Sequence, residues 1–540
     1  MQAFIKPFQQ LGAYGQIAGK LKKNKGVLWI SGCVDSQKVH AACALWQGYR
    51  QRLIITYSEQ KAKEIYEDCR YFDRQAVLYQ AKDFLFFHAD MQGNLLVQQR
   101  VRALQALLTR EEVTVITTFD GLMDRLRPLK KVEDSILCIG QDSIVQIDAL
   151  AEKLSRLGYE REIQVEAPGQ FAVRGGIVDI YAPTEDAPWR IEFWDDEVDS
   201  IRSFDVESQR SMENLEEIVI YPAAEPVPDE KEETVSFLDY FEPGKSLIFL
   251  DEPTRILEKG RTVEKEFEES MANRAAKGEA LPEEARLLYG SEEITSRLNR
   301  RNCLAFSLLE QKAPEWEVTG RYQIDARSIN PYNNSFPTLV KDLKRWKKEK
   351  YAIILMCASG TRARRLAADL QDEELNSFYS EDPGRVVNPS EIMVVHGSLH
   401  RGYEYPMLRF AVISETDIFG REKTKKRKKQ KTYEGQKIQS FSDIKPGDYV
   451  VHENRGIEKV EVDKVMKDYI KIEYAKGGNL YILATQLEMI QKYAGSDARK
   501  PKLNRLGGSE WTRTKSKVRG AVQEVARDLV LLYAARQEKQ

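Results

Sequence analysis

The chain has 540 residues, of which 42% are hydrophobic and 31% are charged. That length is too great for one hydrophobic core, so the sequence predicts several domains. The formal net charge is -2, so no overall electrostatic field attracts nucleic acid. The six cysteines show no Cys-x-x-Cys spacing, which argues against zinc ribbons and a disulfide framework. No apolar run would span a bilayer and no signal-peptide core opens the chain, so we expect a cytoplasmic protein without a membrane partner.

Residues 1–135 alternate between strand-length apolar runs and helical patterns, which is typical of a parallel α/β sheet. The expected strands are Val27–Ser31, Arg52–Tyr57 and Val113–Thr118, and the expected helices include Lys61–Phe72 and Leu96–Leu108.

A loop follows the first of these strands, where a phosphate-binding loop would lie in a nucleotide-binding protein. Gly32 and Lys38 suit such a loop. However, Gln37 stands where a second glycine would let the backbone wrap the phosphates, and Val39 stands where Ser or Thr would hold magnesium. We interpret the segment as a degenerate nucleotide loop, and we expect neither a catalytic residue nor a bound cofactor in this chain.

Two other segments invite a catalytic or metal interpretation. The pair Asp251 and Glu252 follows a predicted strand, as the magnesium-binding carboxylates of an ATPase would, but without a working loop we expect these groups to cap a turn. His396 and His400 lack a nearby third ligand, so a turn with solvated imidazoles is favoured over a metal site.

Residues 136–222 change from a helical to an alternating period, which predicts an antiparallel domain inserted into the α/β module. Its expected strands include Phe171–Ile180 and Arg190–Glu197. Residues 223–335 return to an α/β pattern, and we expect them to complete the domain that residues 1–135 begin.

Residues 336–420 predict a further small α/β domain, and residues 421–442 a basic linker. The basic run in that linker repels itself, which favours a mobile segment. The alternative is a weak, salt-sensitive contact with DNA phosphates through Lys425, Lys426, Arg427, Lys428 and Lys429.

Residues 443–495 alternate short β-branched and aromatic runs with charged residues, which predicts a small antiparallel sheet curled into an SH3/Tudor-like β-barrel. The charged strand Tyr469–Tyr474 is expected at an open edge, where it could accept a strand of another protein. Residues 509–540 show an apolar stripe at helical spacing and predict a long C-terminal helix.

The series Gly447–Ile457, Asp468–Tyr474 and Asn479–Leu483, followed by Leu506-Gly507-Gly508 and Glu510-Trp511, resembles the RNA-polymerase-interacting domain of the bacterial transcription-repair coupling factor. The insert resembles the second domain of the excinuclease protein UvrB, which docks onto the excinuclease protein UvrA and which the coupling factor shares. The resemblance covers nearly the whole chain but only the front half of the family's protein. It implies that ATP and Mg²⁺ are bound by a translocase motor whose motifs are absent here.

The resemblance also implies two sets of contact residues. The excinuclease protein UvrA would contact Arg174, Arg190 and Trp194, although the family more often has phenylalanine at the last position. The alternative is that Trp194 packs in its own core while the arginines pair with Asp195 or Asp196. The RNA polymerase β subunit would contact one strand, through Tyr469, Ile470, Lys471 and Ile472.

The function that follows is that of a non-enzymatic adaptor in nucleotide excision repair. The chain would bind RNA polymerase stalled at DNA damage and recruit the excinuclease protein UvrA. Two alternatives are a damage-binding helicase or ATPase like UvrB, against which Gln37 and Val39 argue, and a transcription regulator that uses only the barrel. The long excinuclease-like first half argues against such a regulator.

Overall fold

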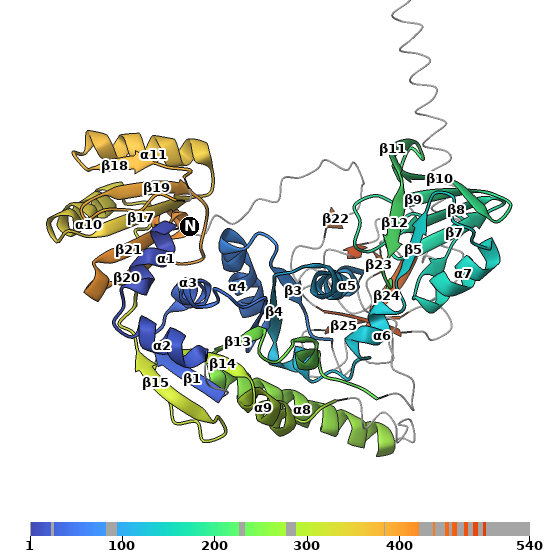
Figure 1. Ribbon diagram of the computed structural model, residues 1–540, viewed down its shortest axis with the longest axis horizontal. Coiled ribbons are helices and arrows are strands. Elements are labelled where there is room, and N and C mark those ends of the chain that lie inside the picture. Colours follow the sequence, from blue (N-terminus) through green and yellow to red (C-terminus); the bar gives the residue numbers. More distant parts are fainter. Residues whose placement is uncertain are drawn as a thin grey trace, which may run out of the picture. The chain divides into compact units, whose positions relative to one another are not determined.

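The computed structural model describes residues 2–22, 26–82, 94–225, 233–276, 288–382 and 384–420, together with six short strands between residues 436 and 492 (Figure 1). These strands belong to a unit separate from the rest of the chain. None of the described helices is long and apolar enough to cross a membrane.

The first α/β module is built on a seven-stranded parallel sheet with the order β15-β1-β14-β13-β2-β4-β3. Strands from both sides of the insert interleave, because β13 and β14 lie between β1 and β2. The segments before and after the insert therefore contribute strands to one sheet. The strands are β1 (Gly26–Ser31), β2 (Gln51–Thr56), β3 (Val77–Tyr79), β4 (Val113–Thr118), β13 (Ser246–Asp251), β14 (Asn302–Ser307) and β15 (Val318–Gln323).

Helices cover both faces of this sheet, because its central strands are apolar on both sides. One face packs against α1 (Gln2–Gln9), α2 (Tyr14–Leu21), α3 (Asp35–Leu45) and α4 (Glu59–Phe72). The other packs against α5 (Asn94–Thr109), η2 (Phe119–Leu122), η3 (Phe237–Tyr240), α8 (Pro253–Ala276) and α9 (Ser291–Asn299). A short helix, α6 (Leu129–Glu133), precedes the insert.

The insert leaves and rejoins the module through one antiparallel pair, β5 (Leu137–Gly140) with β12 (Glu217–Ile220). Between them, α7 (Ile147–Arg156) packs on one face of a six-stranded sheet. The order of that sheet is β11-β10-β9-β8-β7-β6. Its strands are β6 (Glu160–Arg161), β7 (Gln170–Arg174), β8 (Ile177–Tyr181), β9 (Trp189–Trp194), β10 (Glu197–Phe204) and β11 (Ser211–Leu215).

The small α/β domain has the strand order β16-β20-β21-β17-β19-β18. Helices α10 (Phe336–Lys348) and α11 (Gly360–Asp372) pack on one face. The other face shares a single apolar cluster with α1, α3 and α4 of the first module, so the two domains meet through a continuous core. The remaining elements are β16 (Arg327–Ser328), β17 (Ala352–Cys357), β18 (Ser377–Tyr379), β19 (Ile392–His396), β20 (Tyr403–Tyr405), η5 (Pro406–Leu408), β21 (Phe410–Ser414) and α12 (Glu415–Phe419).

The six strands after residue 436 form an antiparallel sheet with the order β22-β27-β23-β24-β25-β26. They are β22 (Gln436–Lys437), β23 (Tyr449–His452), β24 (Gly456–Glu461), β25 (Tyr469–Glu473), β26 (Asn479–Leu483) and β27 (Ile490–Lys492). The expectation that Tyr469–Tyr474 forms an open edge is wrong, because β25 pairs with β24 on one side and β26 on the other. The strand at the edge of the described sheet next to β25 is β26. The helix expected at 509–540 lies outside the described residues, and closure into an SH3/Tudor-like barrel stays a prediction.

Candidate functional site

A later segment of the chain, at Ile324 and Ala326, passes directly against the degenerate nucleotide loop. Gly32 has a φ of +79°, and a Cβ atom at this position would lie 1.9 Å from the carbonyl oxygen of Ile324. The amide of Ala326 donates a 3.3 Å hydrogen bond to the Gly32 carbonyl. Glycine is therefore required here for close approach of two backbone segments, and the passing segment occupies the space beside the loop.

The polar groups of the loop also have partners within the protein. Gln37 is completely buried; its Oε1 accepts a 3.0 Å bond from the Val34 amide, and its Nε2 donates a 2.9 Å bond to the Tyr405 hydroxyl. Ser36 Oγ accepts a 3.0 Å bond from the amide of Arg401. Tyr405 and Arg401 belong to the small domain, so the loop serves as a contact between two domains.

Lys38 forms a buried ion cluster with the two carboxylates that follow β13. Its Nζ lies 2.7 Å from Asp251 Oδ1 and 2.6 Å from Glu252 Oε1, and its side chain is 12% exposed. Burial alone would lower the pKa of Lys38 and raise that of Asp251, but the opposite charges outweigh burial: the pKa of Lys38 is raised and that of Asp251 is lowered. Glu252 Oε1 also accepts a 2.8 Å bond from the Leu308 amide, which agrees with the expected capping role. The sequence did not reveal that Lys38 pairs with both carboxylates.

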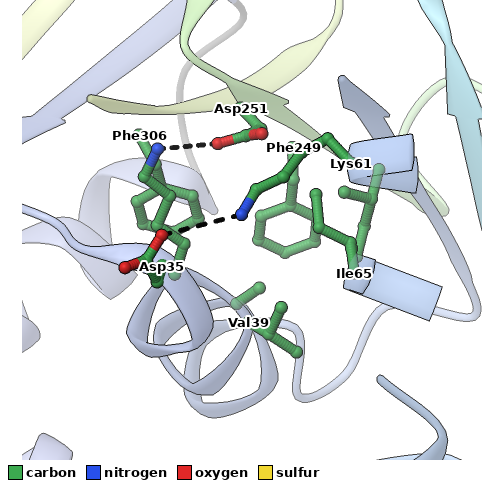
Figure 2. A pocket seen from close by; sticks show the side chains of 10 residues that line it. Asp35, Val39, Lys61, Ile65, Phe249, Asp251 and Phe306 are labelled. Atoms are coloured by element: carbon green, nitrogen blue, oxygen red, sulfur yellow. Dashed lines mark hydrogen bonds and ion pairs between the residues drawn. The ribbon is translucent and has the colours of Figure 1, made fainter. Parts of the chain in front are cut away.

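A small pocket lies beside this cluster, between α3, α4 and the ends of β13 and β14 (Figure 2). Its volume is about 20 Å³, which is room for a water molecule rather than for a nucleotide. A second ion pair, Lys61 Nζ with Asp35 Oδ1 at 3.8 Å, lines it. The lysines near the loop thus already face carboxylates of this chain.

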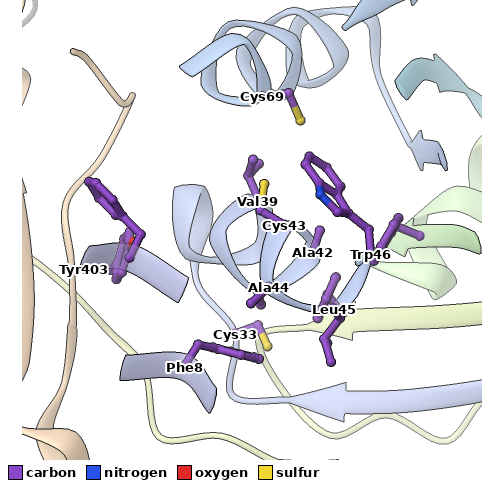
Figure 3. Close-up of a cluster of buried hydrophobic side chains, with 14 of the residues drawn as sticks. Phe8, Cys33, Val39, Ala42, Cys43, Ala44, Leu45, Trp46, Cys69 and Tyr403 are labelled. Atoms are coloured by element: carbon purple, nitrogen blue, oxygen red, sulfur yellow. The ribbon is translucent and has the colours of Figure 1, made fainter. Parts of the chain in front are cut away.

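His40 is buried where the small domain meets the first module. Its Nδ1 lies 2.9 Å from the Tyr405 hydroxyl and its Nε2 lies 2.8 Å from the Phe4 carbonyl oxygen. The ring of Tyr403 stacks on it at 5.1 Å, and Tyr403 belongs to the buried cluster drawn in Figure 3. Burial lowers the pKa of His40 to about 4, so the imidazole is neutral in the folded protein at pH 7.

His400 belongs to the same contact, with its side chain 21% exposed. The Asp68 carboxylate accepts a 2.8 Å bond from the His400 amide and lies 3.1 Å from Nδ1, while Glu67 lies 3.1 Å from Nε2. Burial alone would lower its pKa, but the carboxylates raise it. His396 is exposed, as expected, whereas His400 is an ion-pair partner. The described residues contain no cluster of three or more potential metal ligands.

In the insert, Arg174, Arg190 and Trp194 lie on one face of the sheet. Arg190 and Trp194 are four residues apart on β9, so their side chains lie on the same face of the sheet. The register of β7, β8 and β9 places Arg174 on that face too. Trp194 is 80% exposed, so the alternative that it packs in its own core is wrong. The three residues share one face of the sheet, and their role as contact residues stays a prediction.

The two arginines are held by Asp179 rather than by Asp195 or Asp196. Arg190 Nε lies 2.7 Å from Asp179 Oδ1 and Nη2 lies 2.9 Å from Oδ2, and its guanidinium stacks over Phe204 at 4.4 Å. Arg174 hydrogen-bonds to the same carboxylate. The side chain of Arg190 is 14% exposed and that of Arg174 is 43% exposed, so Arg190 is mainly structural and Arg174 remains accessible.

The residues expected to contact RNA polymerase, Tyr469, Ile470, Lys471 and Ile472, lie on the internal strand β25. The basic residues Lys425, Lys426, Arg427, Lys428 and Lys429 lie outside the described residues.

Sequence reasoning missed a buried charge cluster near the return from the insert. Arg100 is 1% exposed; its Nη2 lies 2.7 Å from Asp124 Oδ2 and 2.6 Å from Glu225 Oε2. Lys82 contacts the same two carboxylates. Burial would raise the pKa of Glu225, but Arg100 and Lys82 lower it to about 2. Nothing local in the sequence marks Arg100, because its partners come from distant segments.

Two family models match the chain. The UvrB interaction domain matches residues 137–225, which covers the insert, and the CarD-like/TRCF RID domain matches residues 444–494, which covers the strands β23 to β27. The fold and these matches define a multidomain α/β protein with a repair-protein-type insert and a polymerase-interaction-type sheet.

Curated relatives match over nearly the whole chain. The transcription-repair-coupling factor of Bacillus subtilis (strain 168) is 30% identical over 90% of this chain and 46% of its own length, and that of Staphylococcus epidermidis (strain ATCC 35984) is 28% identical over 91% and 47%. The chain is therefore similar to transcription-repair-coupling factors over nearly its whole length. It spans about half the length of the curated relatives it matches.

A solved structure of a hypothetical ATP-dependent RNA helicase from Sulfolobus tokodaii also matches, at 9% identity, over 73% of this chain and 82% of the helicase chain. Its TM-score of 0.22 is too low to support an argument.

Proposed function

We propose that this chain is a two-ended adaptor in transcription-coupled repair. One end, the CarD-like/TRCF RID domain, binds RNA polymerase, and the other, the UvrB interaction domain, binds the excinuclease protein UvrA. The observation that carries the proposal is the presence of both domain types in one chain that aligns with coupling factors over about 90% of its length.

The polymerase-binding end is proposed to recognise the β subunit. If recognition uses strand pairing, the described strand order favours β26 over β25, because β25 already has two neighbours. Of the adjacent residues Leu480 and Tyr481, one directs its amide away from β25, and proline at that position removes a donor without breaking the pair with β25.

A binding titration against the isolated β-subunit lobe tests this end. Saturable binding that is lost in Leu480→Pro or Tyr481→Pro, with thermal stability retained, places the contact on β26. If only Ile470→Asp or Ile472→Asp abolishes binding, the contact is made by side chains of β25. Absence of binding by the unmutated chain would contradict the adaptor function.

The proposal includes no nucleotide hydrolysis by the first module. In support, Gln37 and Ser36 bond to other groups of the chain and Lys38 is neutralised by Asp251 and Glu252. A phosphate-release assay with ATP, magnesium and DNA should give the rate of a protein-free control. Release above that rate, abolished by Lys38→Ala, would favour the ATPase alternative.

The repair-protein end is proposed to use the outward face of the insert sheet. Arg174→Ala is the informative arginine variant there, because Arg174 is accessible whereas Arg190 is packed. A pull-down of UvrA that weakens in Arg174→Ala, while polymerase binding is unchanged, would separate the two ends.

A further inference from the structure

We propose that Glu225 is an ionic latch: its bonds to Arg100 and Lys82 hold the insert to the first α/β module, and loss of its charge leaves the insert free to rotate about the β5–β12 pair. The inference concerns motion within the chain and does not depend on the identity of either partner.

The segment that returns from the insert is held on its insert side as far as Ala223. The Tyr159 hydroxyl donates a 2.8 Å hydrogen bond to the Tyr221 carbonyl, and the Ala223 amide donates a 2.8 Å bond to the Leu157 carbonyl. Ala223 is buried and belongs to the apolar cluster of the insert. This end of the segment therefore moves with the insert.

Glu225, in contrast, is held by the first module. Its Oε1 accepts a 2.7 Å bond from the hydroxyl of Tyr79, at the end of β3, and its Oε2 accepts a 2.8 Å bond from Nε of Arg100, on α5. Lys82 Nζ lies 2.9 Å from the same Oε2. Only Ala224 stands between the two anchored ends, and two residues of extended chain span at most about 7 Å. The returning segment therefore has no slack while Glu225 is bound.

The segment that enters the insert is a looser tether. Asp124 also bonds to Arg100, with its Oδ2 2.7 Å from Nη2. However, residues 125–136, which include α6, separate Asp124 from β5. This longer path can adjust when the insert turns, whereas the returning segment cannot.

Other contacts between the insert and α5 are weaker. Arg102 Nη2 lies 3.8 Å from Asp186 Oδ1 in a largely exposed ion pair, and Tyr221 hydrogen-bonds to Gln105 through its side chain. Exposed ion pairs and neutral hydrogen bonds contribute less than buried bonds between charged groups. Glu225 is therefore the strongest of these ties between the insert and the module.

Charge, rather than shape, makes this latch. The side chains of Arg100, Lys82, Asp124 and Glu225 are at most 16% exposed and carry two positive and two negative charges. Glutamine has nearly the shape of glutamate, but its amide nitrogen would replace an oxygen that accepts bonds from cations. Glu225→Gln also leaves two buried cations facing Asp124 alone, which is unfavourable unless the segment moves away.

The test measures rotation of the insert in the full chain. Cys138 lies on β5 and is the exposed one of the six cysteines, so a fluorescent maleimide attaches there without any substitution. Time-resolved anisotropy of the label reports how fast the insert turns. Because rotational correlation time scales with the volume that turns, Glu225→Gln should add a phase several-fold shorter than the slow rotation of the wild-type chain.

Two further variants isolate the charge of Glu225. Glu152→Gln is the matched control, because Glu152 is exposed on the same insert and pairs with Arg156 at the surface. The double variant Lys82→Met, Glu225→Gln leaves Arg100 paired with Asp124, so it removes the latch without an uncompensated buried charge. Thermal melting verifies the folding of each variant, and the double variant decides the test if Glu225→Gln does not fold.

The outcomes are distinguishable. A fast phase in Glu225→Gln and in the double variant, with wild-type rotation in Glu152→Gln, supports the latch. Wild-type rotation in the folded double variant overturns it. Independent rotation of the insert in the unmutated chain also overturns it, because the latch is then not closed.

Discussion

Gln37 Nε2 donates a 2.9 Å hydrogen bond to the hydroxyl of Tyr405, across the contact between the first α/β module and the small domain. Where a nucleotide-binding protein would have a glycine next to phosphate, this chain has a buried amide that holds a second domain in place. The loop is therefore part of a domain contact in this chain.

Gln37→Ala should destabilise this contact. The substitution leaves the Val34 amide without its side-chain acceptor and opens a cavity, so we expect a loss of about 1–3 kcal/mol in the free energy of unfolding. Denaturant unfolding measures the loss, and Gln10→Ala, at an exposed position of the same protein, is the control. Equal stability of the two variants would contradict the structural role of Gln37.

Lys38→Met should be more damaging, because it leaves Asp251 and Glu252 as buried, uncompensated carboxylates. Breaking a buried pair in this way costs about 3–5 kcal/mol. The loss should shrink as the pH falls, since protonation then neutralises the carboxylates. The triple variant Lys38→Met, Asp251→Asn, Glu252→Gln should recover much of the stability at pH 7. If the loss in Lys38→Met does not shrink at low pH and the triple variant is no more stable, uncompensated charge is not the cause.

The two histidines of the domain contact should give opposite pH dependences. The folded pKa of His40 is about 4, below its usual 6.5, so its contribution is fully present above pH 6.5 and is lost as the pH falls toward 4. That loss is roughly 3 kcal/mol. The pKa of His400 is raised, so its contribution is present below pH 6.5 and is lost as the pH rises through the raised value.

Thermal unfolding at a series of pH values tests this prediction. His40→Gln should flatten the acid side of the stability profile, and His400→Gln the side above pH 6.5. A wild-type profile that neither substitution changes would show that other groups control it.

Arg190→Ala should destabilise the insert much more than Arg174→Ala. Arg190 satisfies the fully buried Asp179 with two hydrogen bonds and packs over Phe204, so its removal should destabilise the insert by about 2–4 kcal/mol. Arg174 is accessible, and its removal should cost less than about 1 kcal/mol. Limited proteolysis of the insert measures both, and similar cleavage rates would contradict the distinction.

The local patterns of the sequence predict much of the fold. The strand at Val113–Thr118 is found at the expected residues, and the helix expected at Lys61–Phe72 begins only two residues earlier, at Glu59. Hydrophobic period and loop composition are local properties, so one segment is enough to reveal them. The mismatch at Gln37 and Val39 is local in the same sense, and it is visible in the sequence alone.

What the sequence does not reveal depends on pairing between distant segments. Tyr405 lies 368 positions from Gln37, and Asp179 meets Arg190 only through the register of β8 and β9. Alternation in Tyr469–Glu473 predicts a strand but carries no information about its neighbours, so it does not distinguish an edge from an interior strand.

The interleaved order of the seven-stranded sheet bears on how the chain folds as the ribosome makes it. Strands β1 and β2 are synthesised early, but β14 and β13, which lie between them, end only at residues 307 and 251. The sheet of the insert and its closing pair are complete by residue 220. Because domains generally fold as units during synthesis, the docking insert can reach its final form while the module that carries it is still waiting for its central strands.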